Sequence, residues 1–250
     1  MSTPASLPRF WFRLLTFRAS AGDYGRLHRG HLIAGLITCW LVGIGRYWDD
    51  TRASLLQHTG IGSVIYVFVL AAVMWIVVKP VAPERFTYSG ILTFITLTSP
   101  PAALYAIPVE KWMTLQDANL MNLRFLGIVA LWRLVLWMHY LRRHGQLSAA
   151  GAFCVAAVPL AAIFITLVNL NLHHAVVNVM GGIREADKTS QDAAYGMLNI
   201  LAILSLPVSF IACLGWLWMA LESRSERKMM RAIKLTASSK SVPPSTNPAK

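Results

Sequence analysis

Six apolar runs, separated by short polar segments, limit what this chain can fold into. Each run has about 17–25 residues, and a helix of that length matches the roughly 30 Å hydrocarbon core of a lipid bilayer. We therefore expect an all-α, polytopic bundle of six transmembrane helices. The predicted spans are Leu32–Trp48, Ile61–Val78, Tyr88–Ile107, Leu123–Leu141, Ala149–Leu172 and Met197–Leu221.

Basic residues fall mainly on one side of this predicted membrane. If all six runs span, the N-terminal segment, loops two and four and the C-terminal tail share one side and hold 16 of the 23 Lys and Arg residues. The other three loops hold 5, and Arg124 and Arg133 lie inside the fourth span. Cytoplasmic segments carry such an excess of positive charge. We therefore expect both termini to be cytoplasmic and the protein to lie in a bacterial inner membrane.

The chain divides into three parts. Residues 1–31 form a basic cytoplasmic segment, residues 32–221 the transmembrane domain, and residues 222–250 a basic cytoplasmic tail that is disordered at its end. Within the tail, Glu222–Leu235 is expected to continue the last helix as an amphipathic extension.

The aromatic and basic segment Arg9–Arg18 has two interpretations. In one, Trp11, Leu14 and Phe17 lie in the lipid headgroup region while neighbouring arginines reach phosphates. In the other, the segment is a flexible basic leader. The sequence leaves both open.

Composition excludes several functional classes. With 56% hydrophobic and 14% charged residues, a single soluble core would have too little polar surface. The net charge of +12 is accounted for by the basic side of the membrane, and no basic stripe with interleaved aromatics remains for a nucleic acid. The expected partners are the lipid bilayer and either a second copy of the chain or other membrane proteins.

No metal or cofactor is expected. The three cysteines lie in three different spans, so they offer neither a disulfide framework nor a CxxC metal site. His31 with His139 is the only histidine pair placed for a haem. His173 and His174 with a loop-five acid could form an outer metal site, but adjacent residues do not present both rings on one helical face.

Arg133 is the most unusual residue of the predicted spans. All eleven acidic residues lie in connections, so no carboxylate is at membrane depth, which disfavours a cation-coupled carrier. Prolines near the middle of spans three, five and six each free a carbonyl four residues earlier. We expect Arg133 to donate to such carbonyls and to nearby hydroxyls, which together form a polar seam. The seam consists of Arg133, Thr98, Ser99, Pro100, Pro159, Ser205 and Pro207. It either locks the bundle or binds an anionic ligand.

Two segments resemble the Yip-domain family of small polytopic membrane proteins. The first is Gly22-Asp23-Tyr24-Gly25 running into His31-Leu32-Ile33-Ala34-Gly35, at the start of span one. The second is the proline-bearing span three, from Phe86-Thr87-Tyr88-Ser89 through Ser99-Pro100-Pro101 to Ala106-Ile107-Pro108. The resemblance covers roughly spans one to five. It implies a membrane-organising or adaptor protein and carries over no catalytic residues.

Three functional classes follow. The first is a non-enzymatic membrane scaffold or adaptor whose bent helices pack around Arg133. The second is a transporter or flippase of a small anionic or lipid-like solute, with Arg133 as the anion contact. The third, an enzyme acting on lipid, has only His173, His174 and the loop-five acids as candidates, and we expect no catalytic residues.

Overall fold

The computed structural model describes residues 7–48, 54–169 and 191–240. Within these ranges every regular element is a helix, which confirms the all-α class. Three helices are long and apolar enough to cross a membrane, and a bent pair makes a fourth if it counts as one span. The three are α5 (Ile61–Val78), residues Leu120–Arg143 of α7 (Leu115–Arg143) and residues Leu206–Ile233 of α10 (Gln191–Lys240).

The remaining predicted spans also contain helices. Span one corresponds to α3 (Arg29–Gly45) and span five to α8 (Ala149–Asn169). Both are apolar; α3 has 17 residues, and the part of α8 whose side chains the structure describes is Ala149–Ile163.

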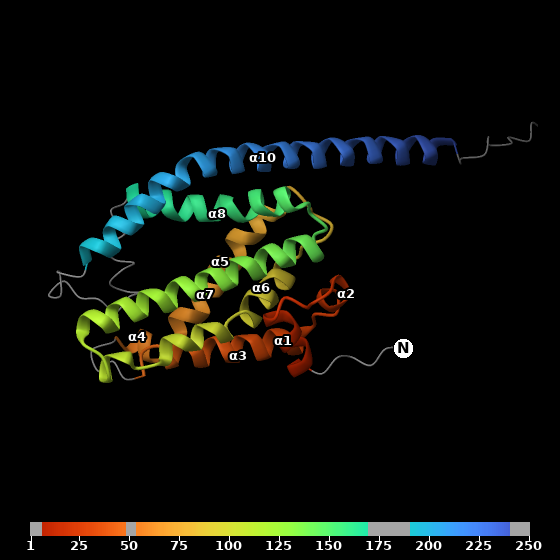
Figure 1. Ribbon diagram of the computed structural model, residues 1–250. Helices are drawn as coiled ribbons and strands as arrows, with labels where there is room; N and C mark the ends of the chain where they lie inside the picture. Colours follow the sequence, from red (N-terminus) through yellow and green to blue (C-terminus); the bar gives the residue numbers. More distant parts are fainter. Residues whose placement is uncertain (1–6, 49–53, 170–190, 241–250) are drawn as a thin grey trace, which may run out of the picture.

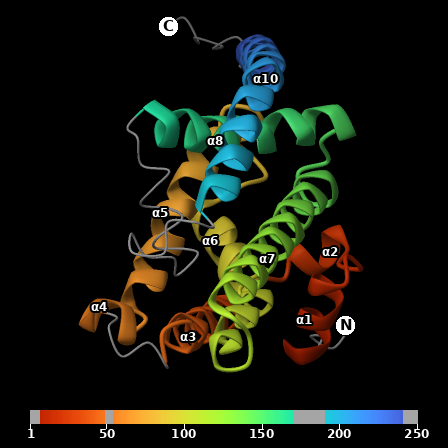
Figure 2. The same ribbon diagram turned by 60° about the vertical axis from the view of Figure 1, so that its left-hand side comes forward.

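The helices run between two ends of an elongated bundle (Figure 1). At one end lie α2 (Ala21–Tyr24), the start of α3, the end of α7 and the start of α8. We call this the α2 end. At the opposite, α4 end lie α4 (Leu55–His58) and the start of α7. Helices α8 and α10 pack side by side, and α7 separates them from α3 (Figure 2).

Span three is the bent pair. Helix α6 (Tyr88–Leu97) ends before Pro100, and the 3₁₀ helix η1 (Pro100–Ala106) continues at an angle, with η2 (Val109–Lys111) after it. The bend is 44°. Two successive prolines remove two amide donors and clash with two preceding carbonyls, so the α-helical hydrogen-bond ladder cannot continue. At Pro159 and Pro207 only one donor is lost, and α8 and α10 continue through them.

Helix α3 approaches its neighbours closely through small residues. Its buried residues recur every fourth position, at His31, Gly35, Cys39 and Gly43. A Cβ at Gly43 would lie 2.6 Å from Ser63 Oγ on α5. Small side chains at such spacing let helices pack without a hydrophobic driving force. Helix α3 therefore contacts α6 and α5 almost backbone to backbone.

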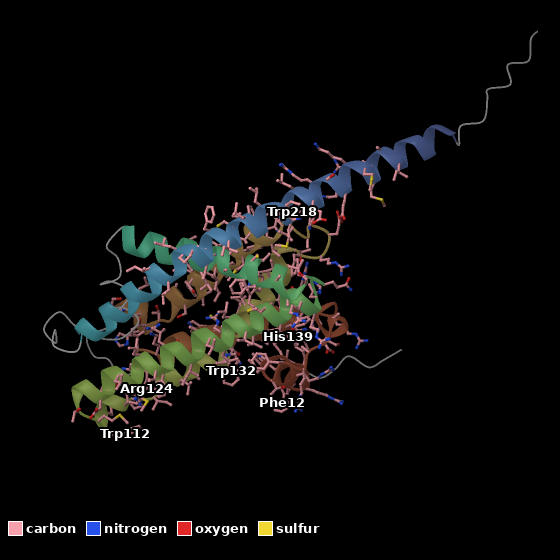
Figure 3. The ribbon with its side chains drawn as sticks, turned by 45° about the horizontal axis from the view of Figure 1, so that its top comes forward. Phe12, Trp112, Arg124, Trp132, His139 and Trp218 are labelled. Atoms are coloured by element: carbon pink, nitrogen blue, oxygen red, sulfur yellow. The ribbon has the colours of Figure 1, made fainter. Side chains whose placement is uncertain are left out.

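Small residues also join α8 to α10. Ala152, Ala156 and Ala161 of α8 are buried, as expected of the alanine-rich start of span five. A Cβ at Gly215 of α10 would lie 2.7 Å from Cys154 Sγ. Other apolar side chains of α10, such as Trp218, are exposed (Figure 3). This is the pattern of a helix with one face in the bundle and one toward lipid.

The N-terminal segment is a docked helix. Helix α1 (Leu7–Leu15) buries Phe10 and Leu14, whereas Phe12 is 62% exposed. Trp11 donates its indole N–H to the Leu97 carbonyl at 2.6 Å. Leu14 and Trp11 thus pack against the protein, where the sequence indicated the headgroup region or a flexible leader. Helix α1 therefore meets α6 through Trp11 and α7 through the Leu15 carbonyl.

Helix α10 continues well beyond the bundle at the α2 end (Figure 1). It remains helical to Lys240, past Leu235, where the extension was expected to end. Near the start of this extension, Arg227 donates to the Pro80 carbonyl at 3.5 Å. Closer to the bundle, the Trp216 indole donates to the Val77 carbonyl at 2.7 Å.

Candidate polar site along helix α7

Arg133 lies on α7 where that helix passes the break in span three. Its side chain is half-buried. It interacts electrostatically with Cys39 of α3 and with Tyr105 of η1. Ser99, at the break itself, is a neighbour of Cys39. The structure therefore brings Arg133 and Ser99 of the predicted seam into one region, together with Cys39 and Tyr105, which the sequence did not single out.

The Arg133 guanidinium makes no hydrogen bond or ion pair with any described residue. We expected it to use the carbonyls freed by the prolines, of which Leu97 O is one. That oxygen instead accepts from Trp11. An indole N–H is donor-only and sits on a rigid ring, so it fills such a site at little cost in side-chain entropy. The guanidinium keeps its five donors available.

The other seam residues have separate roles. Thr98 Oγ1 donates to the Ile95 carbonyl of its own helix at 2.8 Å. Pro100 begins η1, where no amide donor is needed. Pro159 is buried in α8, and Pro207 is exposed on α10. For Ser205 only the helical backbone is described. Pro159 and Pro207 therefore belong to the packed pair of helices α8 and α10.

A second cation lies near the α4 end of this region. The Arg46 guanidinium is 5.1 Å from the centre of the Tyr105 ring and 5.3 Å from that of Tyr47. Tyr105 therefore interacts with two cations, Arg46 directly after α3 and Arg133 of α7. Cation–π contact contributes to this arrangement. The region around η1 is consequently electropositive.

From Arg133 to the α2 end, α7 carries a stripe of side chains with polar tips. The stripe consists of Arg133, Trp137, Tyr140 and His144, at spacings of four, three and four residues. Such spacing places all four on one helical face. The spacing of the stripe is visible in the sequence, whereas the packing of its rings depends on how α2 and α6 meet α7.

Aromatic rings from several elements pack around the α2 half of this α7 stripe. The Phe94 ring of α6 stacks on Tyr140 with centroids 4.3 Å apart. Tyr140 in turn stacks with His144 at 5.1 Å, and Tyr24 of α2 meets Tyr140 edge-on at 4.8 Å. Each pair contributes about 0.5–1.5 kcal/mol beyond its buried area. The cluster fixes α2 and α6 against α7.

Hydrogen bonds from α7 hold the N-terminal segment in place. Trp132 Nε1 donates to the Leu15 carbonyl at 3.1 Å. His139 Nε2 lies 3.0 Å from the Ala19 carbonyl, so this nitrogen carries the proton. Both side chains are marked on α7 in Figure 3, beside the helix that bears Phe12. Because His139 is engaged in this way, its ring is committed to the fold.

An ion pair closes the turn between α1 and α2. Arg13 contacts Asp23 at 2.9 Å, and the Ser20 amide and hydroxyl each donate to Asp23 at 2.8 Å. Burial opposes ionisation of Asp23, but the Ser20 hydrogen bonds and the charges of Arg13 and Arg26 together hold its pKa below its usual range. The carboxylate is therefore charged and fully engaged by its neighbours.

Among residues 7–48, 54–169 and 191–240, no group of three or more His, Cys, Asp or Glu side chains is placed to hold a metal ion. The His31 ring packs on Phe10 at 5.3 Å and on His28 at 4.1 Å. The predicted outer metal and lipid-enzyme site of loop five, with His173 and His174, falls outside the described residues.

His144 gives the α2 end a pH dependence. Its Nε2 donates to the Arg85 carbonyl at 2.8 Å. Burial lowers the pKa of His144; the Arg85 carbonyl opposes this, and the Arg85 charge adds to it. Because the folded state favours the neutral ring, its contribution to stability is complete above the unfolded pKa of about 6.5 and is lost as the pH falls below that value.

We therefore expect acidification from about pH 7.5 to about pH 5 to lower the unfolding midpoint of the wild-type protein more than that of His144→Gln, by on the order of 2 °C. Thermal unfolding of both proteins in detergent measures this difference. Equal pH dependence of the two midpoints would show that His144 does not titrate with folding.

Searches against family models, curated proteins and solved structures found no match for the chain. The resemblance to the Yip-domain family therefore stays a prediction from the residues that carry it.

Proposed function

We propose that this chain is a six-span protein of a bacterial inner membrane, with both termini cytoplasmic, and that it binds and moves a small anionic or lipid-like solute through Arg133. The α2 end is then the cytoplasmic end. The positive-inside distribution of Lys and Arg supports this orientation. The arrangement of the helices agrees with this orientation. The start of α3 and the end of α7, both predicted to be cytoplasmic, lie at the same end of the bundle.

One observation carries the anion-binding role. Arg133 lies in the middle part of an apolar helix without an acceptor from the described residues. Placing an arginine at the centre of a membrane helix costs about 2.5–3.5 kcal/mol. An arginine that served only to lock the bundle would recover this cost through hydrogen bonds to the carbonyls at the break. Trp11 occupies the Leu97 carbonyl instead, so the guanidinium can bind a ligand.

The chemistry around Arg133 suits an anion. The neighbouring groups are the Ser99 hydroxyl, the Cys39 thiol and Tyr105, and Arg46 lies over the Tyr105 ring. These groups can donate hydrogen bonds, and the two guanidiniums supply positive charge. A planar guanidinium also binds carboxylate or phosphate oxygens in pairs. A free organic anion and a phospholipid headgroup share this chemistry.

The test is anion-dependent stabilisation of the purified protein. We expect inorganic phosphate, or phosphatidylglycerol in mixed micelles, to raise the unfolding midpoint of the wild type. Phosphatidylcholine should have little effect. Arg133→Gln should weaken the apparent affinity at least about tenfold, the loss expected for one charge-assisted hydrogen bond. Arg133→Lys should retain part of it, because the charge remains but the bidentate geometry is lost.

Arg124→Gln is the matched control. Arg124 lies on the same helix, nine residues away and so on the opposite face, and is exposed (Figure 3). Equal weakening by Arg124→Gln and Arg133→Gln would exclude a specific site. Flux of the stabilising anion into proteoliposomes, lost in Arg133→Gln, then distinguishes transport from binding alone.

A scaffold or adaptor is the second candidate, and the extension of α10 favours it. Arg224, Lys228 and Arg231 are exposed there, alongside exposed Met229, Met230 and Ile233. A protruding basic, amphipathic helix can bind an acidic partner. If the chain is an adaptor, a truncation after Ser223 should abolish capture of partners from native membranes and leave anion-dependent stabilisation intact.

A further inference from the structure

Buried polar atoms without partners gather along the α7 stripe. Tyr24 OH, His31 Nδ1 and Trp137 Nε1 are buried and make no hydrogen bond to described residues, and the buried Ser99 Oγ has only the Cys39 thiol beside it. Their residues are each at most 7% exposed. Only one other described side chain has such an atom, Trp75 Nε1 on α5. Natural proteins leave few buried polar groups unpaired, so each instance calls for an explanation.

These atoms lie between Arg133 and the α2 end. The rings of Trp137 and Tyr140 are 5.7 Å apart, and Tyr24 lies against Tyr140. Phe10 of α1 joins Tyr24 to His31, with ring centroids 6.5 Å and 5.3 Å away. The twelve residues from Arg133 to His144, eleven helical rises, cover about 16 Å of helix. The unpartnered atoms therefore accompany the stripe over half the thickness of a bilayer.

Ring packing alone does not explain these polar tips. Phenylalanine at positions 24 and 137 would preserve aromatic contacts with Tyr140 and Phe94 and bury no unpaired donor. Burying a hydroxyl or indole N–H without a partner is unfavourable. Water or a ligand that accepts hydrogen bonds would remove this penalty.

The donor chemistry points to an anion. Indole N–H and guanidinium groups donate only, and the Tyr24 and Ser99 hydroxyls can turn to donate. The carboxylate nearest Tyr24 is Asp23, which the Arg13 ion pair and the Ser20 hydrogen bonds occupy. His31 can donate or accept, according to its tautomer. A hydrated row of such hydrogen-bond donors favours anionic solutes over cations.

We propose that the face of α7 from Arg133 to His144, together with Tyr24, His31 and Ser99, is a hydrated route by which an anionic solute reaches Arg133 from the α2 end. This rests on the proposed anion-binding function and adds the direction of access and its selectivity for charge. The solute class is a small organic or inorganic anion.

Cys39 is a natural reporter for this route. It is 4% exposed, lies near Ser99 and Arg133, and belongs to the buried face of α3. In a Cys154→Ala, Cys213→Ala background it is the sole cysteine. The probes are two methanethiosulfonates of similar size, the anionic ethylsulfonate and the cationic ethyltrimethylammonium. They are added to vesicles that expose the α2 end, which a terminal epitope tag identifies.

We expect the anionic reagent to modify Cys39 at least about tenfold faster than the cationic one, and faster from the α2 end than from the α4 end. Arg133→Gln should reduce this preference for the anion. No modification of Cys39 by either reagent, or equal rates for both, would overturn the route. Detergent-unfolded protein, in which both reagents must react, confirms that the thiol is intact.

The unfolding midpoint of Tyr24→Phe provides an independent test. If the hydroxyl binds water or an anion, its removal lowers the midpoint by about 3 °C and slows Cys39 modification. If the hydroxyl is unpaired, its removal raises the midpoint, and that result overturns the proposal. Trp137→Phe and Trp75→Phe form a matched pair, since only Trp137 lies on the stripe. Trp137→Phe should slow modification, and Trp75→Phe should leave its rate unchanged.

The two proposals fail differently. If Arg133-dependent stabilisation by phosphate persists but Cys39 does not react, the route is wrong and the anion-binding site stands. If Cys39 reacts with a preference for the anion but phosphate stabilisation does not depend on Arg133, the hydrated route stands and the proposed function is wrong.

Discussion

Gly35→Ala is expected to destabilise the bundle by about 2–3 kcal/mol, because α3 and α6 leave no room for a methyl group at this position. A Cβ built at Gly35 would lie 2.8 Å from Thr96 Cβ and 3.1 Å from Leu97 N, and would also collide with Thr96 Oγ1. Thr96 is fully buried and belongs to the helix end at the break, so it cannot turn away. The two helices must separate.

Gly127→Ala is the matched control. Gly127 lies within α7, and a Cβ there meets no other atom within 4 Å. Alanine should stabilise that helix by about 1 kcal/mol through its intrinsic propensity. The same propensity gain acts at Gly35, so the difference between the two variants isolates the steric term. Equilibrium unfolding in mixed micelles, followed by far-ultraviolet circular dichroism, measures both. Equal stability of the two variants would contradict the close α3–α6 contact.

Apolar run length was sufficient to locate the helices. The predicted span Ile61–Val78 coincides with α5, since Gly60 and Lys79 bound an uninterrupted apolar run. The six-span count goes beyond the described residues, among which three helices have spanning length and composition, or four with the bent pair. Helix α3, with 17 residues, and the described part of α8, Ala149–Ile163, are apolar as well.

The proline effects depended on context that residue type does not supply. All three proline positions were expected to bend their helices. Only Pro100-Pro101 ends an α-helix, because two adjacent prolines interrupt the backbone hydrogen-bond ladder at two successive positions. Helices α8 and α10 continue through one proline each. A sequence reading could have made this distinction from the proline count alone.

The candidate site was predictable in its centre and not in its contacts. Arg133 stood out because an arginine at membrane depth requires acceptors. Which donor reaches the Leu97 carbonyl depends on how α1 docks, 86 residues away in sequence. The apolar periodicity of α1 predicts one apolar face. It does not determine whether lipid or protein covers that face. The α7 stripe is predictable from the sequence, because the spacing of its four residues is a local pattern.

Trp11→Ala is expected to release α1 from the bundle, at a cost of about 3 kcal/mol from lost aromatic packing and the lost hydrogen bond to Leu97 O. The release should be local, since α1 contacts the bundle mainly through Phe10, Trp11 and Leu14. Hydrogen exchange of residues 7–15 measures it. The control is Phe12→Ala on the same helix, where the side chain is 62% exposed and exchange should stay near wild type.

Trp11→Phe separates packing from hydrogen bonding. It keeps an aromatic ring and removes the N–H, so it should cost about 1–3 kcal/mol, the penalty of leaving the buried Leu97 carbonyl without a donor. Protection of residues 7–15 that is unchanged in both Trp11 variants would contradict docking through this bond. Release of α1 has a further consequence, because Phe10 covers Tyr24 and His31. Once Phe10 leaves, the α2 end of the stripe is open to water, and Cys39 should react with the anionic reagent faster in Trp11→Ala than in Phe12→Ala.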